Sequence, residues 1–199
     1  MTFPDFLSLF LPLFVAMDPL GILPAFIQMT SELSPARRQK MVNLSILTAG
    51  IVGLLFIPLG PLVLGVLGLK TGDFQVAGGL LVLVVALRDV VWDQKLMAMS
   101  EASEATGIVP FGIPLLVGPA VFATLILLRD RFSMIEIGFC LILNLLFSWF
   151  IFRRSTGLMQ WMGVTGTRVV SKLAALLLAA YAVMMIRVGL TSLRQFFSN

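Results

Sequence analysis

Six apolar runs, each about as long as a bilayer is thick, constrain what this 199-residue chain can fold into. They lie at about 4–29, 41–67, 74–91, 108–128, 134–152 and 170–190. A helix needs roughly 20 apolar residues to cross a hydrocarbon core of about 30 Å. Only 12% of the residues are charged, whereas a soluble domain carries about a quarter. The sequence predicts an all-α polytopic membrane protein with six transmembrane helices in the lipid bilayer.

The composition also excludes several classes of function. The chain has no histidine and a single cysteine, Cys140, which lies inside an apolar run. Histidine is the commonest metal ligand and the usual general base, so we expect no metal, no cofactor and no enzyme activity. The basic residues are spread through short loops, so nucleic acid is not an expected partner. Without a phosphate-binding loop, direct use of ATP is not expected either.

The first apolar run is interrupted in its middle. FLPLFVAMDPLGILPAF (10–26) places Asp18, Pro19, Gly21 and Pro24 at its centre, about 18 Å from the start of the span at 1.5 Å per residue. A buried Asp there costs roughly 2.5–3.5 kcal/mol, and proline removes a backbone donor. We interpret the run as a discontinuous helix, with Asp18 as the N-cap and Pro19 as the first residue of the second half.

The fourth run is interrupted in the same way, and the chain repeats itself. IVPFGIPLLVGPAVFATLILL (108–128) contains Pro110, Pro114 and Pro119, and an offset of 100 aligns Asp18-Pro19 with Gly118-Pro119. Further on, 67–81 parallels 162–178. Three spans in each copy make the second copy inverted, as in many secondary transporters. We expect one repeat at 1–91, a cytoplasmic connecting loop at 92–107 and the inverted repeat at 108–199. The alternative is that glycine and proline coincide by chance, because both are common in membrane helices.

The two breaks together suggest a site for a small zwitterion. Gly118 has no side chain to cap the helix that follows, so amides near Ala120 and Val121 are expected as donors to a carboxylate. Asp18 and the carbonyls of the first break are expected to hold an ammonium group. The candidate substrate-binding residues are Asp18, Pro19, Gly21, Gly118, Pro119, Ala120 and Asn144, with helix breaks at Pro24, Pro110 and Pro114.

Each of these assignments has a structural alternative. Asp18 can serve only as a helix cap, and Gly21 and Gly118 can serve only close helix packing. Asn144 can bond a neighbouring helix instead of facing a cavity, and that is the commoner role. Thr124 is expected to bond its own helix backbone.

The distribution of Lys and Arg predicts the topology. Nine of the fourteen lie in the loops that follow spans one, three and five: Arg37, Arg38, Lys40, Arg88, Lys95, Arg153, Arg154, Arg168 and Lys172. The other five lie on the opposite side: Lys70, Arg129, Arg131, Arg187 and Arg194. The excess marks the cytoplasmic side, so both termini are expected outside the cytoplasm.

The motifs DPLGxLPxF, VAGGLL and IVPFGIPLLVGPA resemble those of the MarC family, the SnatA-type small neutral amino acid transporters, and the similarity covers nearly the whole chain. The resemblance implies six spans, broken spans one and four, and transport of substrates such as glycine and alanine. Family motif positions fall on Asp18, Pro19, Leu20, Gly21 and Pro24, then on Pro110, Pro114, Gly118 and Pro119. The chain departs from the family at Gln75 and Lys172, where an arginine is common.

The leading interpretation is therefore a secondary transporter in the inner membrane, coupled to H⁺ or Na⁺, with Asp18 as the natural proton carrier. A small channel or an exporter of another small polar metabolite is the alternative. The sequence leaves the substrate, the coupling ion, the direction of transport and the oligomeric state open.

Overall fold

The structure is a computed structural model that describes residues 2–91 and 116–197, and all regular structure in these ranges is helical. Its helices are α1 (Phe3–Met17), α2 (Pro19–Met29), α3 (Pro35–Val66), α4 (Thr71–Val91), α6 (Pro119–Arg129), α7 (Met134–Arg153) and α8 (Ser155–Phe197). The predicted first span is thus two helices, because the chain leaves helical geometry at Asp18. The helix that contains the second apolar run begins before that run, with Ser34 as N-cap and Pro35 as its first residue.

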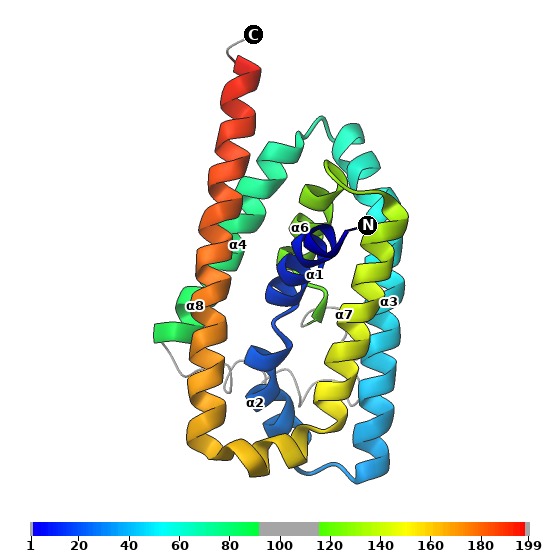
Figure 1. The fold of residues 1–199 in the computed structure, drawn as a ribbon, viewed down its shortest axis with the longest axis vertical. Coiled ribbons are helices and arrows are strands. Elements are labelled where there is room, and N and C mark those ends of the chain that lie inside the picture. The colour runs from blue at the N-terminus through cyan, green and yellow to red at the C-terminus, as the bar shows by residue number, and fades with distance from the viewer. Residues whose placement is uncertain (1, 92–115, 198–199) are drawn as a thin grey trace.

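The helices form a bundle with the interrupted elements at its centre. Figure 1 shows α4 and α8 on one side, α3 and α7 on the other, and α1, α2 and α6 between them. The strongest packing joins α4 to α8 and α3 to α7. These are the third and sixth, and the second and fifth, of the predicted spans. In Figure 1 the members of each pair run in opposite directions.

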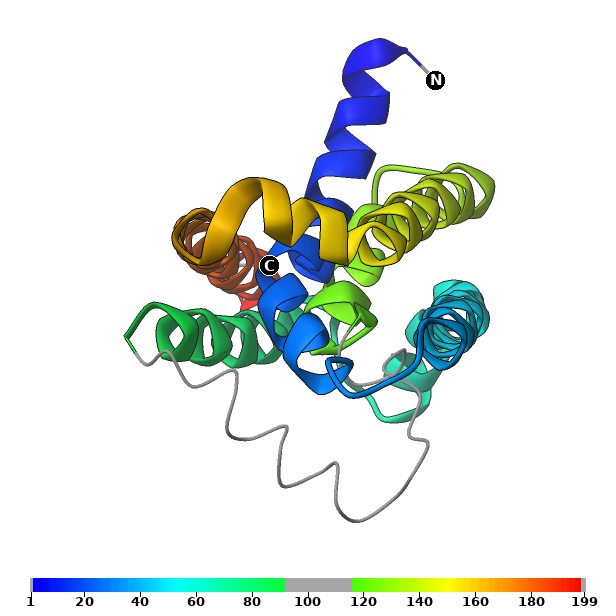
Figure 2. The ribbon, with the colours of Figure 1, turned by 90° about the horizontal axis from the view of Figure 1, so that it is seen from below.

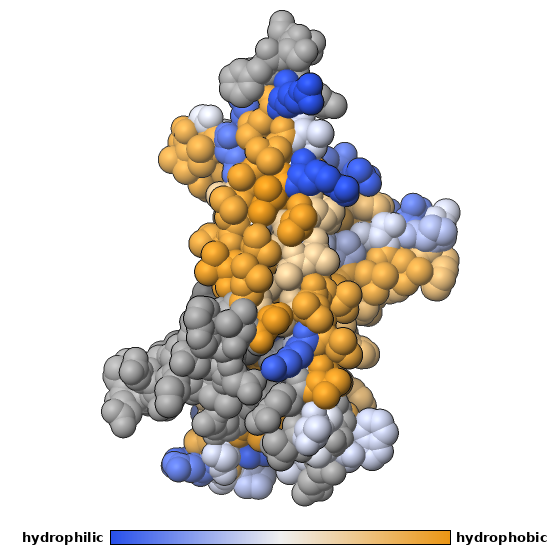
Figure 3. Space-filling model, turned by 90° about the vertical axis from the view of Figure 1, so that its left-hand side faces the viewer, coloured by the Kyte–Doolittle hydropathy of each residue, from blue (hydrophilic) through white to orange (hydrophobic). Residues whose placement is uncertain are grey.

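Among the described residues, four helical stretches are long and apolar enough to cross a membrane: Phe3–Leu23, Pro35–Val66, Met134–Arg153 and Val169–Arg194. Two shorter apolar helices, Thr71–Leu87 and Pro119–Arg129, accompany them. Figure 3 shows apolar side chains over the middle of the α4–α8 side, with hydrophilic ones mostly toward the two ends. The helical membrane class is confirmed, whereas the count of six spans stays a prediction. The predicted loop 92–107, with Pro110 and Pro114, lies outside the described residues.

Glycines bring the backbones of α4 and α8 into contact. A Cβ added to Gly79 would lie 2.9 Å from the carbonyl oxygen of Ala182 and 3.1 Å from the amide nitrogen of Ile186. A Cβ on Gly189 would lie 2.8 Å from the carbonyl oxygen of Gly72. Small residues allow such close approach in membrane helices, where packing replaces the hydrophobic effect as the force between helices. The small-residue stretch of the third span therefore serves helix packing.

Gly79→Ala is expected to destabilise the protein by about 1–3 kcal/mol, because the new methyl group must push α8 away. Thermal unfolding in detergent micelles measures this effect. Gly50→Ala is the matched control, since a Cβ there meets only Leu145 Cδ1 at an ordinary 3.5 Å. Equal melting temperatures for the two variants would contradict the assignment of Gly79 to the α4–α8 contact.

Two positions differ from what the sequence predicts. The segment GVTGTR (163–168), which lies between the fifth and sixth apolar runs, is helical except at Gly163, where φ is 66° and α8 bends. The first helix also does not run along the bundle: Figure 2 shows α1 projecting outward toward the N-terminus. Counting rise per residue therefore overstates how far Asp18 lies along the bundle axis, because that count assumes a helix parallel to the axis.

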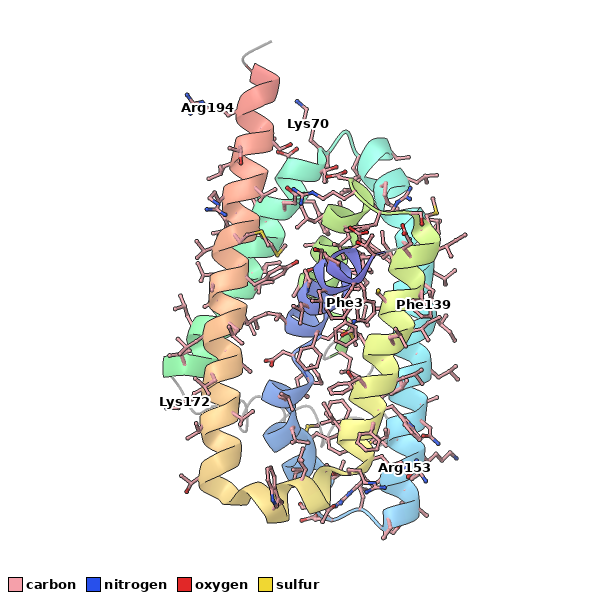
Figure 4. The ribbon with its side chains drawn as sticks, viewed as in Figure 1. Phe3, Lys70, Phe139, Arg153, Lys172 and Arg194 are labelled. Atoms are coloured by element: carbon pink, nitrogen blue, oxygen red, sulfur yellow. The ribbon has the colours of Figure 1, made fainter. Side chains whose placement is uncertain are left out.

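Basic residues lie toward both ends of the bundle. Figure 4 shows Lys70 and Arg194 near one end and Arg153 near the other, with Lys172 partway along α8. At the Arg153 end, Arg38 donates to the carbonyl oxygen of Thr30 at 2.8 Å and to Thr156 Oγ1 at 2.6 Å. These positions agree with the predicted grouping of basic residues into two sets. Which end faces the cytoplasm stays a prediction.

Candidate functional site

Asp18 connects α1 and α2 and caps both of them. Its amide donates to the carbonyl oxygen of Phe14 at 3.0 Å, which closes the last turn of α1. Its own carbonyl accepts from Ile22 at 3.1 Å, and its Oδ1 accepts from the Gly21 amide at 3.0 Å. The residue adopts left-handed geometry, with φ 44° and ψ 52°, which Asp and Asn tolerate better than other side chains. The expected N-cap role of Asp18 is thus present.

Gly21 provides the space that the Asp18 carboxylate occupies. A Cβ built on Gly21 would fall onto that carboxylate, 2.6 Å from its Cγ. The Gly21 carbonyl in turn accepts from Ser171 Oγ of α8 at 3.4 Å. Asp18 is only 8% exposed, so its carboxylate is held inside the bundle beside the start of α2. Gly21 is therefore required here for close approach of a side chain.

The break leaves carbonyl groups at the end of α1 without helical donors. The last four carbonyls of a helix have no partner within it; among the described residues, that of Phe14 accepts from the Asp18 amide. Pro19 has no N–H to offer Val15, and the Gly21 amide bonds the Asp18 side chain. The end of α1 also carries the negative pole of the helix dipole. The first break is thus an electronegative region suited to a cation or an ammonium group.

The start of α6 has the opposite polarity. Gly118 is the N-cap, in an extended conformation and without a side-chain cap hydrogen bond. The amides of Val121 and Phe122 both donate to the Gly118 carbonyl, at 3.0 and 3.1 Å. The expectation of a free amide at Val121 is therefore wrong, because the first turn closes on Gly118. The Ala120 amide stands one residue earlier, where a helix has no internal acceptor for it.

Shared packing partners place the two breaks in one region. Val15, in the last turn of α1, and Ala120, in the first turn of α6, both pack against the cluster of Val82, Ala86, Leu178 and Ala182 from α4 and α8. Figures 1 and 2 both show the α1–α2 junction beside the start of α6, at the centre of the bundle. Of the predicted residues, the structure brings Asp18, Pro19, Gly21, Gly118, Pro119 and Ala120 to this region.

Asn144 lies on α7 and contacts α1 away from the break. Its Nδ2 donates to the carbonyl oxygens of Phe10 at 3.3 Å and Cys140 at 2.9 Å. Phe10 precedes Asp18 by eight residues, about 12 Å of helix. These bonds match the alternative in which Asn144 bonds a neighbouring helix. Its Oδ1 is buried and has no hydrogen-bond partner in the structure. Contact between Asn144 and a substrate stays a prediction, and Oδ1 is the atom that would make this contact.

The predicted helix breaks have different outcomes. Residue 24 lies within α2, which continues from Pro19 to Met29. The expectation of a helix break at Pro24 is therefore wrong: the chain breaks at Asp18, where a left-handed residue precedes a proline. Among the residues that the structure describes, no group of three His, Cys, Asp or Glu side chains is placed to hold a metal ion.

Sequence reasoning missed one polar pair. Thr124 Oγ1 bonds the Ala120 carbonyl at 2.7 Å, as expected for a helical threonine. It also lies 2.9 Å from the hydroxyl of Tyr181 on α8. The only signal in the sequence was a single tyrosine within an apolar span.

Comparison with known proteins identifies the family. Residues 3–194 match the MarC family integral membrane protein model. The chain is 31% identical to the UPF0056 membrane protein YhcE of Escherichia coli (strain K12), over 94% of this chain and 93% of that protein. A UPF0056 membrane protein of Buchnera aphidicola subsp. Acyrthosiphon pisum (strain APS) is 31% identical over 98% and 99%. The UPF0056 inner membrane protein YhgN of Escherichia coli (strain K12) is 30% identical over 89% and 92%. No solved structure matches the chain. The chain belongs to the MarC family of integral membrane proteins.

Proposed function

We propose that this protein is a secondary transporter of small neutral amino acids such as glycine and alanine, with the substrate bound between the two helix breaks. The observation that carries the proposal is the meeting of two opposite polarities at the centre of the bundle. Asp18 and the carbonyls that end α1 attract an ammonium group. The start of α6, without a side-chain cap at Gly118, attracts a carboxylate. A zwitterion carries both groups a short distance apart.

The packing supports an inverted repeat, which alternating access in such carriers uses. The spans that the repeat equates pack against each other in antiparallel pairs, α3 with α7 and α4 with α8. The alignment of 67–81 with 162–178 also equates Gly68 with Gly163. These two are the described glycines with positive φ, at 68° and 66°. Matching backbone geometry at matched positions favours a common origin of the two halves over chance.

The proposal also includes the topology of the carrier and its coupling ion. The carrier lies in the inner membrane with both termini outside the cytoplasm, as the distribution of Lys and Arg indicates. Coupling is to H⁺ through Asp18, or to Na⁺ through the carbonyls at the end of α1. The protein moves its substrate unchanged and is not an enzyme.

The test is counterflow in liposomes that contain the purified protein. Unlabelled glycine or alanine inside should drive saturable accumulation of the labelled amino acid from outside. Imposed proton and sodium gradients then identify the coupling ion. Flux that rises linearly with concentration and shows no counterflow would indicate a channel. Absence of any amino acid flux, with counterflow of another small polar metabolite, would indicate an exporter of that metabolite.

Gly118→Ser is expected to raise the half-saturation concentration for glycine at least about tenfold. The new hydroxyl can cap the first turn of α6 and so occupy the amide that the carboxylate needs. Stability should change by only a few tenths of a kcal/mol, because glycine is itself a fair N-cap. The control is the opposite exchange at another cap, Ser34→Gly, where Ser34 Oγ accepts from the Arg37 amide at 3.4 Å. Ser34→Gly should leave glycine transport unchanged.

A further inference from the structure

The polar contact between Tyr181 and Thr124 has a definite direction. Thr124 is fully buried, and its hydroxyl lies 2.7 Å from the Ala120 carbonyl oxygen and 2.9 Å from the Tyr181 hydroxyl oxygen. A carbonyl can only accept, so the single Thr124 proton goes to Ala120. Tyr181 must then be the donor to Thr124 Oγ1. The three groups form one chain of hydrogen bonds that runs from α8 to the first turn of α6.

This chain ends at the turn where the substrate carboxylate is proposed to bind. Ala120 is the second residue of α6, and Gly118 provides no side-chain cap. The residue after Tyr181, Ala182, belongs to the cluster against which Ala120 packs. The Tyr181–Thr124 bond is therefore a side-chain anchor from another helix at a turn that lacks a cap of its own.

We propose that Tyr181 is a positioning residue that fixes the first turn of α6 against α8 and thereby sets the affinity of the site for the substrate carboxylate. This inference rests on the proposed function. The backbone amides at a helix N-terminus bind an anion well only when their N–H groups point at it. Without the Tyr181–Thr124 bond, the first turn of α6 can shift relative to α8. The α6 amides must then be realigned with the carboxylate each time the substrate binds.

The test compares variants in the counterflow assay with glycine. Tyr181→Phe removes the donor and keeps the ring, and Thr124→Val removes the acceptor at nearly the same volume. Both are expected to raise the half-saturation concentration about three- to twenty-fold, the range for one hydrogen bond between membrane helices. The maximal rate should stay within about twofold. Thr124→Ser keeps the hydroxyl and should behave as the wild type does.

The double variant Tyr181→Phe/Thr124→Val decides whether the two residues act together. Its half-saturation concentration should equal that of either single variant, because both break the same chain. The inference is overturned if the two effects multiply, if Tyr181→Phe leaves the half-saturation concentration unchanged, or if Thr124→Ser is as impaired as Thr124→Val. If the Tyr181→Phe variant fails to insert into the membrane, Thr124→Val still tests the inference, because it leaves Tyr181 unchanged. Failure of the wild type to exchange glycine would instead refute the proposed function.

Discussion

Gly21→Ala is expected to destabilise the protein by about 2–6 kcal/mol and to abolish transport. The added methyl group would fall onto the Asp18 carboxylate, 2.6 Å from its Cγ. Overpacking of this kind costs about 1–3 kcal/mol. Moving the carboxylate away adds about 1–3 kcal/mol, because the buried Gly21 amide then loses its acceptor. Thermal unfolding in detergent micelles, together with counterflow, measures both effects.

Gly65→Ala is the matched control for Gly21→Ala. Both glycines lie in helices, but a Cβ on Gly65 meets no atom within 4 Å. Alanine is the better helix former, so this variant should be as stable as the wild type or slightly more stable. If Gly21→Ala unfolds at the same temperature as Gly65→Ala, the close contact between Gly21 and Asp18 is wrong.

Asp18→Asn is expected to keep the fold and reduce glycine counterflow at least about tenfold. Asparagine retains an oxygen that can accept from the Gly21 amide, and it tolerates left-handed geometry as aspartate does. The cap of α2 is therefore kept, and Asp18→Asn should be more stable than Asp18→Ala. The charge is lost, however, and a hydrogen bond to a charged group contributes about 1.5–3 kcal/mol. Asp18→Ala loses the cap as well and should be clearly destabilised.

The same variant separates three roles of Asp18. If Asp18 only caps α2, Asp18→Asn transports normally and the proposed site is wrong. If Asp18 carries the coupling proton but does not touch the substrate, counterflow without a gradient persists, and uptake driven by a proton gradient is lost. If Asp18 holds the substrate ammonium, as we propose, counterflow itself is lost. Measurement of both transport modes on one preparation distinguishes these results.

Local chemistry let the sequence predict the positions of the breaks. The missing N–H of a proline and the capping oxygen of an aspartate act within about four residues. Asp18-Pro19 and Gly118-Pro119 therefore mark a helix start in any tertiary setting. The same locality explains why α3 starts at Pro35, directly after the N-cap Ser34. Pro24 was mispredicted because a proline in the second turn of a helix can be accommodated without ending it.

Only the tertiary structure decided which residues meet. In a soluble helix the apolar stripe shows which face is buried, but a membrane helix is apolar on every side because lipid and protein interior are equally apolar. The sequence therefore could not show that Tyr181 reaches Thr124, 57 residues away, or that Asn144 bonds Phe10 rather than the break. It also could not show the inclination of α1. The sequence determined where the backbone opens, and helix packing determined which groups surround the opening.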